Sequence, residues 1–230
     1  MLYNIVSFCY GNNFETLLPY WMEHINKKCK NYKISIVRPT DYNLEEYFCN
    51  GYAWWDIYRM KKIVELVRNN EIVVHIDLDI VIFKDIMDLI NLPYDIIFSK
   101  EHFEDNAFPI ECSKILGLGV CSGFFIVKPT ALRFIEKIFS RMMNRTYDNY
   151  SDQVNIMKYI VNNTYLKKEE NVILDNVEYI NTIIEIDNIR ICILDFDIIR
   201  RDSGININHY CIHYNKDDIG FSELICKFIC

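Results

Sequence analysis

The sequence contains little of what marks flexible, repetitive or membrane-spanning chains. Only seven glycines and five prolines occur in 230 residues, which argues against low-complexity segments and long linkers. No uninterrupted apolar run approaches the roughly 20 residues that a membrane-spanning helix requires. The N-terminus lacks a basic segment followed by a long apolar stretch, so no signal peptide is expected. These absences predict one globular domain over residues 1–230, without a membrane span.

Paired cysteine motifs and an excess of positive charge are also missing. The nine cysteines form no C-x-x-C pair, and several lie in apolar runs, where cysteine behaves as a small hydrophobic residue. We therefore expect reduced thiols in a cytoplasmic protein. The net charge of −7 disfavours electrostatic binding to nucleic acid. The heavy use of Ile, Asn, Lys and Tyr is expected of an AT-rich source genome, such as that of a large DNA virus.

Strand and helix patterns alternate along the chain. The predicted strands cover residues 3–8, 33–37, 71–83, 95–99 and 122–127, with short strands between 172 and 199. The predicted helices cover residues 14–28, 56–69, 129–143 and 152–161, the last capped by Ser151. The stretch 100–120 is mixed in polarity and is predicted to be an irregular binding loop. This alternation predicts an α/β fold with a mainly parallel sheet flanked by helices, and with functional loops at the carboxyl ends of the strands.

Two carboxylates interrupt the most apolar run of the sequence. Residues 71–83 are predicted to form one strand buried on both faces, with Asp77 and Asp79 towards its C-terminal end. Buried carboxylates are costly unless a cation compensates them, although two solvated acids at a strand end are the ordinary alternative. Side chains two apart on a strand share a face, so both acids can reach one ion. Oxygen ligands favour Mg²⁺ or Mn²⁺, and such an ion suits a nucleoside diphosphate.

The same segment admits a different enzyme class. Residues 77–81 (DLDIV) resemble the DxDx[TV] signature of haloacid-dehalogenase-type phosphatases, in which the first aspartate is a nucleophile and the second a general acid. That family carries the motif on its first strand, whereas here at least two strand–helix units precede it. Asp217 and Asp218 could imitate that family's late acidic pair, but Lys216 lies beside them rather than far upstream. A phosphatase that uses Asp77 and a non-catalytic binder of nucleotide sugars or glycans therefore stay as alternatives.

Four segments of the chain, in matching order, resemble the glycosyltransferases of the GT-A fold. Residues 54–62 (WWDIYRMKK) and the strand after them look like the stretch that leads into the family's DxD motif. Residues 121–130 (CSGFFIVKPT) are similar to its NSGFFxxRPT strand, and residues 150–155 (YSDQVN) to its DQxxxN helix start. Residues 213–216 (HYNK) resemble its C-terminal histidine motif. The nearest groups are the nucleotide-diphospho-sugar transferases and the retaining galactosyltransferase- and glycogenin-like enzymes.

The resemblance implies a metal-dependent transferase that takes a nucleoside diphosphate sugar, with a UDP-hexose as the favoured donor. Asp79 would bind the ion directly, and Asp77 would bind the ion or the donor ribose. His213 would return from the far end of the chain as a further ligand, and its imidazole favours Mn²⁺ over Mg²⁺. A core or surface histidine is the ordinary alternative for His213, and His209 is the competing ligand. His75 lies deeper in the strand and is expected to be structural.

The resemblance also implies residues around the sugar and the leaving group. Lys216 would neutralise the departing diphosphate, although a solvated surface lysine is nearly as good an explanation. Asp152 would contact sugar hydroxyls or lie near the reacting carbon, unless it only stabilises a helix N-terminus. Ser122 and Gly123 would line the donor sugar with little side-chain bulk, and Cys121 stands where the family has asparagine. Gln153 is expected beside them, since a buried amide needs partners.

Basic and aromatic residues complete the expected site. Arg59 and Lys62 lie one turn apart on a helix and could reach a phosphate, or could simply belong to its polar face. Phe8 and Tyr10 end the first strand, where the fold places the base, and Tyr10 could stack on it. The resemblance favours retention of the anomeric configuration, but no nucleophile stands out. The candidates are Asp152 and a cluster that is equally well explained as a solvated loop, formed by Glu101, Glu104 and Asp105.

Overall fold

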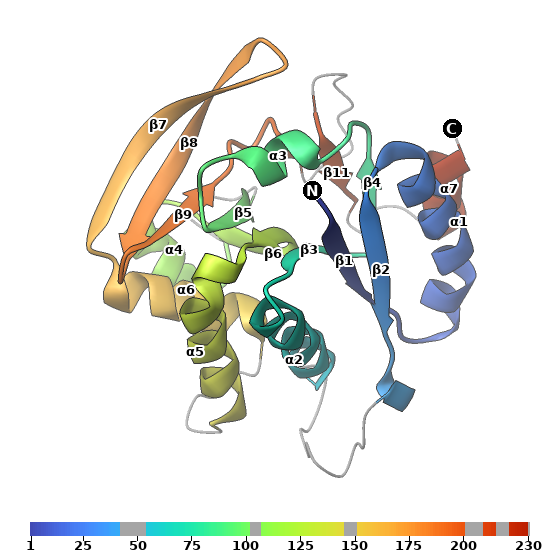
Figure 1. Cartoon of the computed structure of the whole chain (residues 1–230), viewed down its shortest axis with the longest axis horizontal. Helices are drawn as coiled ribbons and strands as arrows, with labels where there is room; N and C mark the ends of the chain where they lie inside the picture. The colour runs from blue at the N-terminus through green and yellow to red at the C-terminus, as the bar shows by residue number, and fades with distance from the viewer. Residues whose placement is uncertain (42–53, 102–106, 145–150, 201–208, 215–220, 230) are drawn as a thin grey trace.

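The computed structural model describes residues 1–41, 54–101, 107–144, 151–200, 209–214 and 221–229 (Figure 1). Its centre is an eight-stranded sheet with the strand order β2-β1-β3-β6-β5-β9-β8-β7. These strands are β1 (Tyr3–Phe8), β2 (Tyr32–Val37), β3 (Ile72–Ile76), β5 (Ile96–Lys100), β6 (Val120–Val127), β7 (Leu166–Leu174), β8 (Val177–Ile186) and β9 (Ile189–Ile193). A three-stranded sheet consists of β10 (Ile199–Arg200), β11 (Cys211–His213) and β4 (Ile80–Ile82).

Helices cover both faces of the large sheet. They are α1 (Asn12–Lys28), α2 (Trp54–Arg68), α3 (Met87–Asn91), α4 (Ile110–Leu116), α5 (Leu132–Met143), α6 (Asp152–Asn163) and α7 (Phe221–Ile229), with single 3₁₀ turns at Pro39–Asp41 and Pro129–Ala131. Six of the eight strands point the same way, while β6 and β8 run against them. The predicted mainly parallel sheet flanked by helices is therefore confirmed.

Alternate residues of the central strands enter two separate cores. Ile5 and Val74 pack with α1, α7 and the small sheet, whereas Val6 and Val73 pack with α2, α4, α5 and α6. Side chains of a strand alternate between the faces of a sheet, so strands covered on both faces are apolar throughout. Figure 1 shows α1 and α7 together at one side and α2, α5 and α6 together at the other.

The prediction of a single strand over residues 71–83 is wrong. Strand β3 ends at Ile76, and the chain turns before β4 begins at Ile80, with the Ile80 N–H donating to the Asp77 carbonyl at 3.1 Å. β4 then pairs with β11 in the small sheet. An apolar, β-branched run cannot distinguish one long strand from two short strands in different sheets. Asp77 and Asp79 consequently lie on a turn, not on one face of a strand.

Four further local predictions are corrected. The stretch 100–120 is not wholly irregular, because it contains α4, which ends at Gly117 in the left-handed conformation (φ 67°). The predicted helix 129–143 begins as a 3₁₀ turn. Ser151 makes no side-chain capping hydrogen bond at α6. The short strands expected after residue 172 are instead led by a long β7–β8 hairpin, whose turn residues Asp175 and Asn176 both have positive φ.

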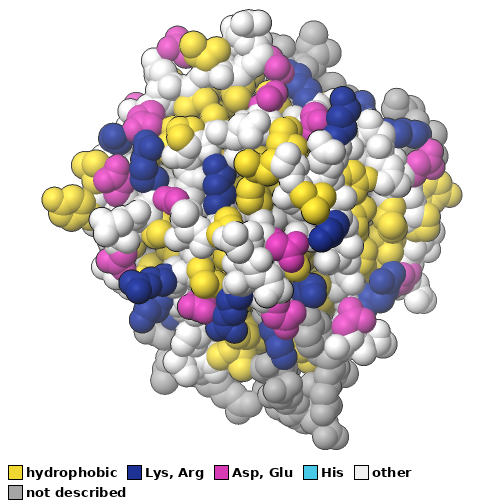
Figure 2. Space-filling view, in the orientation of Figure 1, with side chains coloured by type: hydrophobic (Ala, Val, Ile, Leu, Met, Phe, Trp, Pro, Cys, Tyr) yellow, Lys and Arg dark blue, Asp and Glu magenta, His cyan; other side chains and the backbone are white. Residues whose placement is uncertain are grey.

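The surface carries both signs of charge. On the face shown in Figure 2, Lys and Arg side chains are interspersed with Asp and Glu across the described residues. Seven cysteines in the described part of the chain are free thiols, six of them buried. Among the described residues, no helix combines the length and apolar character needed to cross a membrane. The assignment of residues 1–230 to one domain stays a prediction.

Candidate active site

A cavity of about 240 Å³ opens where β1 and β3 end side by side. Parallel strands bring their carboxyl ends to one edge of a sheet, so residues distant in sequence meet there. Aromatic side chains form one part of its lining and charged side chains the other. The lining residues are Phe8, Tyr10, Phe14, Trp55, Asp56, Arg59, Asp77, Leu78, Asp79, Ser122, Ser151 and Asp152.

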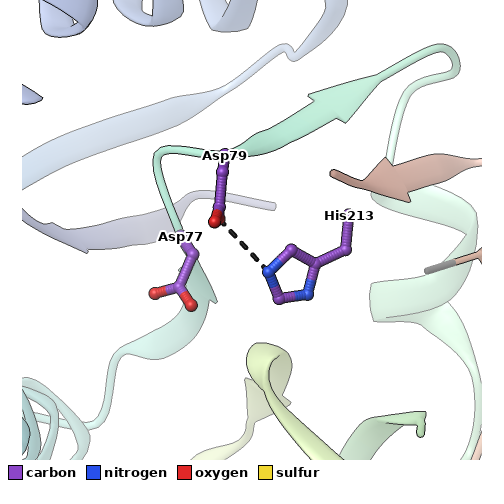
Figure 3. Close-up of side chains that lie close together, drawn as sticks. All are labelled: Asp77, Asp79 and His213. Atoms are coloured by element: carbon purple, nitrogen blue, oxygen red, sulfur yellow. Dashed lines mark ion pairs between the residues drawn. The ribbon is translucent and has the colours of Figure 1, made fainter. Parts of the chain in front are cut away.

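Three potential metal ligands converge beside this cavity (Figure 3). Ligand atoms of Asp77, Asp79 and His213 all lie within 4.8 Å of one another. The antiparallel pairing of β11 with β4 places His213 opposite Ile80, and the Tyr214 N–H donates to the Asp79 carbonyl at 3.0 Å. The small sheet thereby brings the imidazole to the turn that carries the two acids. His213 Nε2 lies 3.2 Å from Asp79 Oδ1.

A bulge in β6 closes this group from the other side. Cys121 pairs with Ser99 and Phe125 with Phe98, so the residues between them arch away from β5. The Ser99 Oγ lies 3.2 Å from the Cys121 carbonyl and 3.1 Å from the Phe124 carbonyl, so its one proton serves both ends of the bulge. At the top of the arch, the Gly123 carbonyl accepts the Asp77 N–H at 2.9 Å.

Only glycine fits at position 123. A Cβ there would lie 2.5 Å from His213 Cε1 and 2.9 Å from Asp77 Oδ2. Both distances are shorter than van der Waals contact, so any side chain would displace a potential ligand. The bulge is therefore built to let the backbone approach the Asp77–His213 pair closely.

The donor set fits a divalent cation. Asp79 Oδ1 is buried and accepts no hydrogen bond from the described residues, its contact being the ion pair with His213. The His213 Nδ1 atom faces the buried Cys121 Sγ at 3.5 Å, which leaves Nε2 directed at the acids. Burial alone would lower the pKa of His213, but the Asp79 carboxylate raises it well above its ordinary value. Binding of an ion would displace that proton, since imidazole binds metal in its neutral form.

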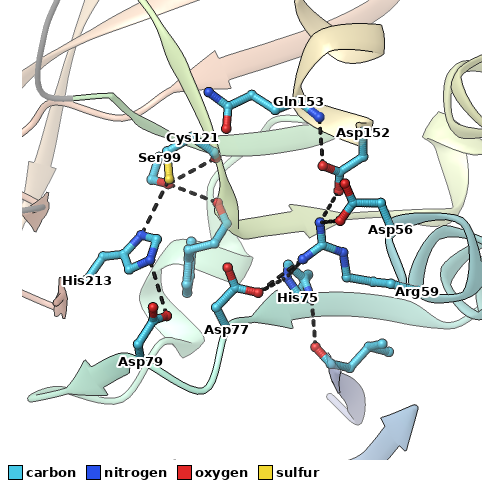
Figure 4. Close-up of polar contacts among 12 residues, drawn as sticks. Asp56, Arg59, His75, Asp77, Asp79, Ser99, Cys121, Asp152, Gln153 and His213 are labelled. Atoms are coloured by element: carbon cyan, nitrogen blue, oxygen red, sulfur yellow. Dashed lines mark hydrogen bonds and ion pairs between the residues drawn. The ribbon is translucent and has the colours of Figure 1, made fainter. Parts of the chain in front are cut away.

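Arg59 is the centre of a buried network next to this group (Figure 4). Its Nη2 atom donates to Asp56 at 2.8 Å and also to Asp152. Its Nη1 atom donates to Asp77 Oδ1 at 3.0 Å. Because Oδ1 of Asp77 is held by the protein, its Oδ2 is the oxygen that faces Gly123 and His213.

His75 completes the network from within the sheet. Its Nδ1 atom lies 2.9 Å from the Val6 carbonyl and must donate to it. Its Nε2 atom lies 2.9 Å from both Arg59 Nη1 and Asp77 Oδ1, and in the neutral ring it accepts from Arg59. Burial and the Arg59 charge lower the pKa of His75, which keeps the imidazole neutral. Burial alone would raise the pKa of Asp77, but its contacts with His75 and Arg59 lower it. We assign the lowering to Arg59, because a neutral imidazole brings no charge.

Most of the predicted site residues meet here. Seven line the cavity: Phe8, Tyr10, Arg59, Asp77, Asp79, Ser122 and Asp152. Gly123 and His213 lie directly behind them. The buried Cys121 thiol contacts His213 and does not line the cavity.

Three of the predicted residues that the structure describes do not join this group. Lys62 pairs with Glu65 at 3.5 Å, and the Gln153 side chain donates to the Phe108 carbonyl at 2.8 Å. His209 Nδ1 lies 2.5 Å from the Asp197 carbonyl, outside the three-residue ligand group. Lys216 lies outside the described residues, as do Glu104 and Asp105.

Asp56 and Trp55 belong to the site although no sequence pattern had predicted a role for them. Asp56 lies three residues before Arg59, and this spacing is a signal for an ion pair on one helix face. The Trp55 ring lies 6.3 Å from the rings of both Phe8 and Tyr10, measured between centroids. No local signal in the sequence indicates that α2 delivers this ring to the end of β1.

Comparisons with known proteins show which family and fold the chain resembles. A family model described as nucleotide-diphospho-sugar transferase matches residues 51–216. A glycosyltransferase involved in glycosylation of the major capsid of PBCV-1 has a TM-score of 0.59 and 11% identity, with 98% of each chain covered. The galactosyltransferase LgtC, solved with donor and acceptor sugar analogues, has a TM-score of 0.58 and 11% identity, covering 97% of this chain and 95% of that chain.

A third similar structure is mouse xyloside xylosyltransferase 1, with a TM-score of 0.54 and 12% identity, covering 94% of this chain and 98% of that chain. At these identities the structural likeness shows the fold alone, and it confirms the predicted GT-A fold. No match to a curated protein was found.

Proposed function

This chain belongs to the nucleotide-diphospho-sugar transferase family and is a glycosyltransferase. From that premise we propose that it moves a hexose from a UDP-sugar to an acceptor hydroxyl in a reaction that needs a divalent ion. The observation that carries the proposal is the meeting of Asp77, Asp79 and His213 at the end of β3. Two acids and an imidazole from distant parts of the chain suit a Mn²⁺ or Mg²⁺ ion, with the imidazole favouring Mn²⁺.

Different parts of the cavity suit different parts of the nucleotide-sugar donor. We assign the base to the aromatic part of the lining, where Phe8, Tyr10 and Trp55 present stacking surfaces. We assign the diphosphate to the turn with Asp77 and Asp79. A divalent ion bound there would offset the charge of the departing diphosphate. Lys216 is proposed to add a second positive charge.

Asp152 is proposed to orient the transferred sugar. Its Oδ2 atom is held by Arg59, and its Oδ1 atom accepts the Gln153 N–H at 2.6 Å. A carboxylate with both oxygens engaged keeps lone pairs for sugar hydroxyls but is a weak nucleophile. The proposed retention of configuration therefore rests on the family resemblance, and we propose that the reacting carbon lies near Asp152.

The two alternatives lose their support. A haloacid-dehalogenase-type phosphatase needs its motif after the first strand, whereas Asp77 follows β3, the third strand along the chain. A non-catalytic binder is disfavoured by the transferase family to which the chain belongs. The cytoplasmic location and the uracil base of the donor stay predictions.

A thermal-shift panel of nucleotide sugars with and without Mn²⁺ tests the proposal. A donor at about 100 times its dissociation constant raises the free energy of unfolding by about 2.7 kcal/mol, so a UDP-hexose should raise the melting temperature only when Mn²⁺ is present. Asp79→Ala and His213→Ala should abolish this ion-dependent shift. Asp187→Asn, an exposed residue of the β8–β9 turn, is the control and should keep it. No stabilisation by any nucleotide sugar would refute the proposed donor class.

A further inference from the structure

The charges around Arg59 do not cancel. The guanidinium donates to three carboxylates, those of Asp56, Asp77 and Asp152. The remaining neighbour, His75, is neutral, because burial and the Arg59 charge lower the pKa of its imidazole. Three carboxylates against one cation leave two negative charges in excess. The side chains of Arg59, Asp56 and Asp152 are only 7%, 13% and 1% exposed, so water compensates little of this excess.

The three carboxylates differ in what stabilises their charge. Asp77 belongs to the group that faces a divalent cation. Asp152 accepts from Arg59 and from the Gln153 N–H at the N-terminus of α6, where the helix dipole favours an anion. Asp56 lies in the first turn of α2 and accepts from Arg59 and from the Asp152 backbone N–H, so its partners are of the same kinds. The two differ in exposure, 13% for Asp56 against 1% for Asp152, so Asp56 is the carboxyl whose proton can both relieve the excess and reach a ligand in the cavity.

The electrostatics of the site agree with this assignment. Burial and the negative charge of Asp152 raise the pKa of Asp56 to about 8, although Arg59 opposes the shift and Asp77 adds to it. At neutral pH the Asp56 side chain is then a carboxylic acid, which can donate a hydrogen bond, whereas a carboxylate can only accept. Asp56 and Asp152 both line the cavity, so a donor and an acceptor stand side by side on its wall.

We propose that Asp56 acts as a neutral carboxyl that donates a hydrogen bond to a hydroxyl of the nucleotide-sugar donor. This role rests on the proposed function. A hydroxyl group both donates and accepts, so it can accept from Asp56 while it or its neighbour donates to Asp152. Two parts of the donor carry such hydroxyls, the ribose and the transferred hexose. Ionisation of Asp56 removes the donated hydrogen bond and adds a negative charge close to the diphosphate.

Donor affinity should therefore fall as the pH rises through about 8. The direction and size of this change in donor affinity follow from proton linkage. If the bound state requires one proton on Asp56, the affinity falls by at most about tenfold for each pH unit above the pKa of Asp56. His213 titrates in the opposite sense, since an ion binds its neutral form and is lost towards acid pH. His213 therefore cannot cause an alkaline loss, and disappearance of that loss in Asp56→Asn assigns it to Asp56.

Isothermal titration of UDP and of a UDP-hexose in the presence of Mg²⁺, from about pH 7 to about pH 9, tests the proposal. Asp56→Asn keeps a neutral side chain with an N–H donor that cannot ionise, so its affinity should show no alkaline loss. Asp56→Ala should bind at least about tenfold more weakly at neutral pH. Asp187→Asn removes an acid outside the cavity and should keep the wild-type pH profile.

The outcomes distinguish a ribose hydroxyl from a hexose hydroxyl, and failure of the role of Asp56 from failure of the proposed function. An alkaline loss seen with both ligands assigns the contact to the ribose, and a loss seen only with the UDP-hexose assigns it to the sugar. An alkaline loss that persists in Asp56→Asn, or its absence from the wild type, overturns the proposal. Binding of neither ligand at any pH overturns the proposed function instead.

An infrared measurement decides the protonation state without ligand. The band of a protonated carboxyl should be present in the wild type at neutral pH and disappear at alkaline pH, and Asp56→Asn should lack it. The wild-type spectrum suffices if Asp56→Asn does not fold. A wild-type spectrum without this band at neutral pH overturns the proposal.

Discussion

Replacing Gly123 by alanine should damage the metal site while leaving the fold intact. The added Cβ would lie 2.5 Å from His213 Cε1 and 2.9 Å from both Asp77 Oδ2 and His213 Nδ1. The backbone at Gly123 cannot retreat freely, because its carbonyl accepts the Asp77 N–H at 2.9 Å. The imidazole or the carboxylate must therefore move away from the position in which the two face one ion.

The size of the effect follows from the cost of overpacking a well-filled site. Inserting a methyl group where no space exists typically costs about 1–3 kcal/mol. If the ligands move to relieve this cost, the same energy is lost from ion binding, which corresponds to roughly a 5- to 150-fold weaker affinity for Mn²⁺. The loss of unfolding free energy should be small, because movement of the ligands relieves the strain.

Electron paramagnetic resonance of free Mn²⁺ measures the affinity, and thermal unfolding without metal measures the stability. Gly117→Ala is the matched control. Gly117 has φ 67° and no close contact, so alanine there should cost about 1 kcal/mol of stability through backbone strain and leave Mn²⁺ affinity unchanged. Wild-type Mn²⁺ affinity in Gly123→Ala would refute the arrangement of Asp77 and His213 around one ion.

Three other predictions concern the network and the core. Arg59→Met leaves the acidic side chains of Asp56, Asp77 and Asp152 without their cation and should cost about 3–5 kcal/mol in urea unfolding. Arg68→Met, which breaks an exposed pair on the same helix, should cost less than about 1 kcal/mol, and equal losses would contradict a buried network. Ser99→Ala removes the hydroxyl that serves both ends of the β6 bulge, so the unfolding free energy should fall by about 1–3 kcal/mol and Mn²⁺ should bind more weakly. An unchanged Mn²⁺ affinity would show that the bulge holds its shape without Ser99. Burial lowers the pKa of His24 below its ordinary value of 6.5, so the unfolded chain takes up a proton first as the pH falls. The unfolding free energy should therefore decrease below about pH 6.5, by up to about 1.4 kcal/mol per pH unit. His24→Gln should show a shallower dependence on pH.

The sequence identified the acids but misjudged the backbone that carries them. The apolar run around Asp77 and Asp79 correctly predicted a buried strand that ends at the site. It could not show that β3 stops at Ile76 and that β4 belongs to another sheet, since both strands have the same β-branched composition. The two acids nevertheless converge, because a turn brings neighbouring side chains together as effectively as a shared strand face does.

The charged network shows the limit of local patterns most clearly. Arg59 was expected to reach a phosphate, and the structure places its guanidinium among Asp56, Asp77 and Asp152 instead. Asp152 comes from a helix 93 residues further along the chain, and nothing in the local pattern of either helix indicates that the two ends meet. Lys62, one turn from Arg59, faces Glu65 and solvent, although the sequence treated the two cations alike.

By itself, the sequence determined the fold class, the family and the residue types of the site. Period-two and helical patterns record which faces are buried, and short motifs keep their order along the chain. Only the tertiary structure decided which side chains share the site: His213 reaches Asp79 through the pairing of β11 with β4, and Gly123 reaches both ligands through the bulge in β6. Such contacts depend on sheet register and on the packing of distant segments, and neither is written in the local order of residues.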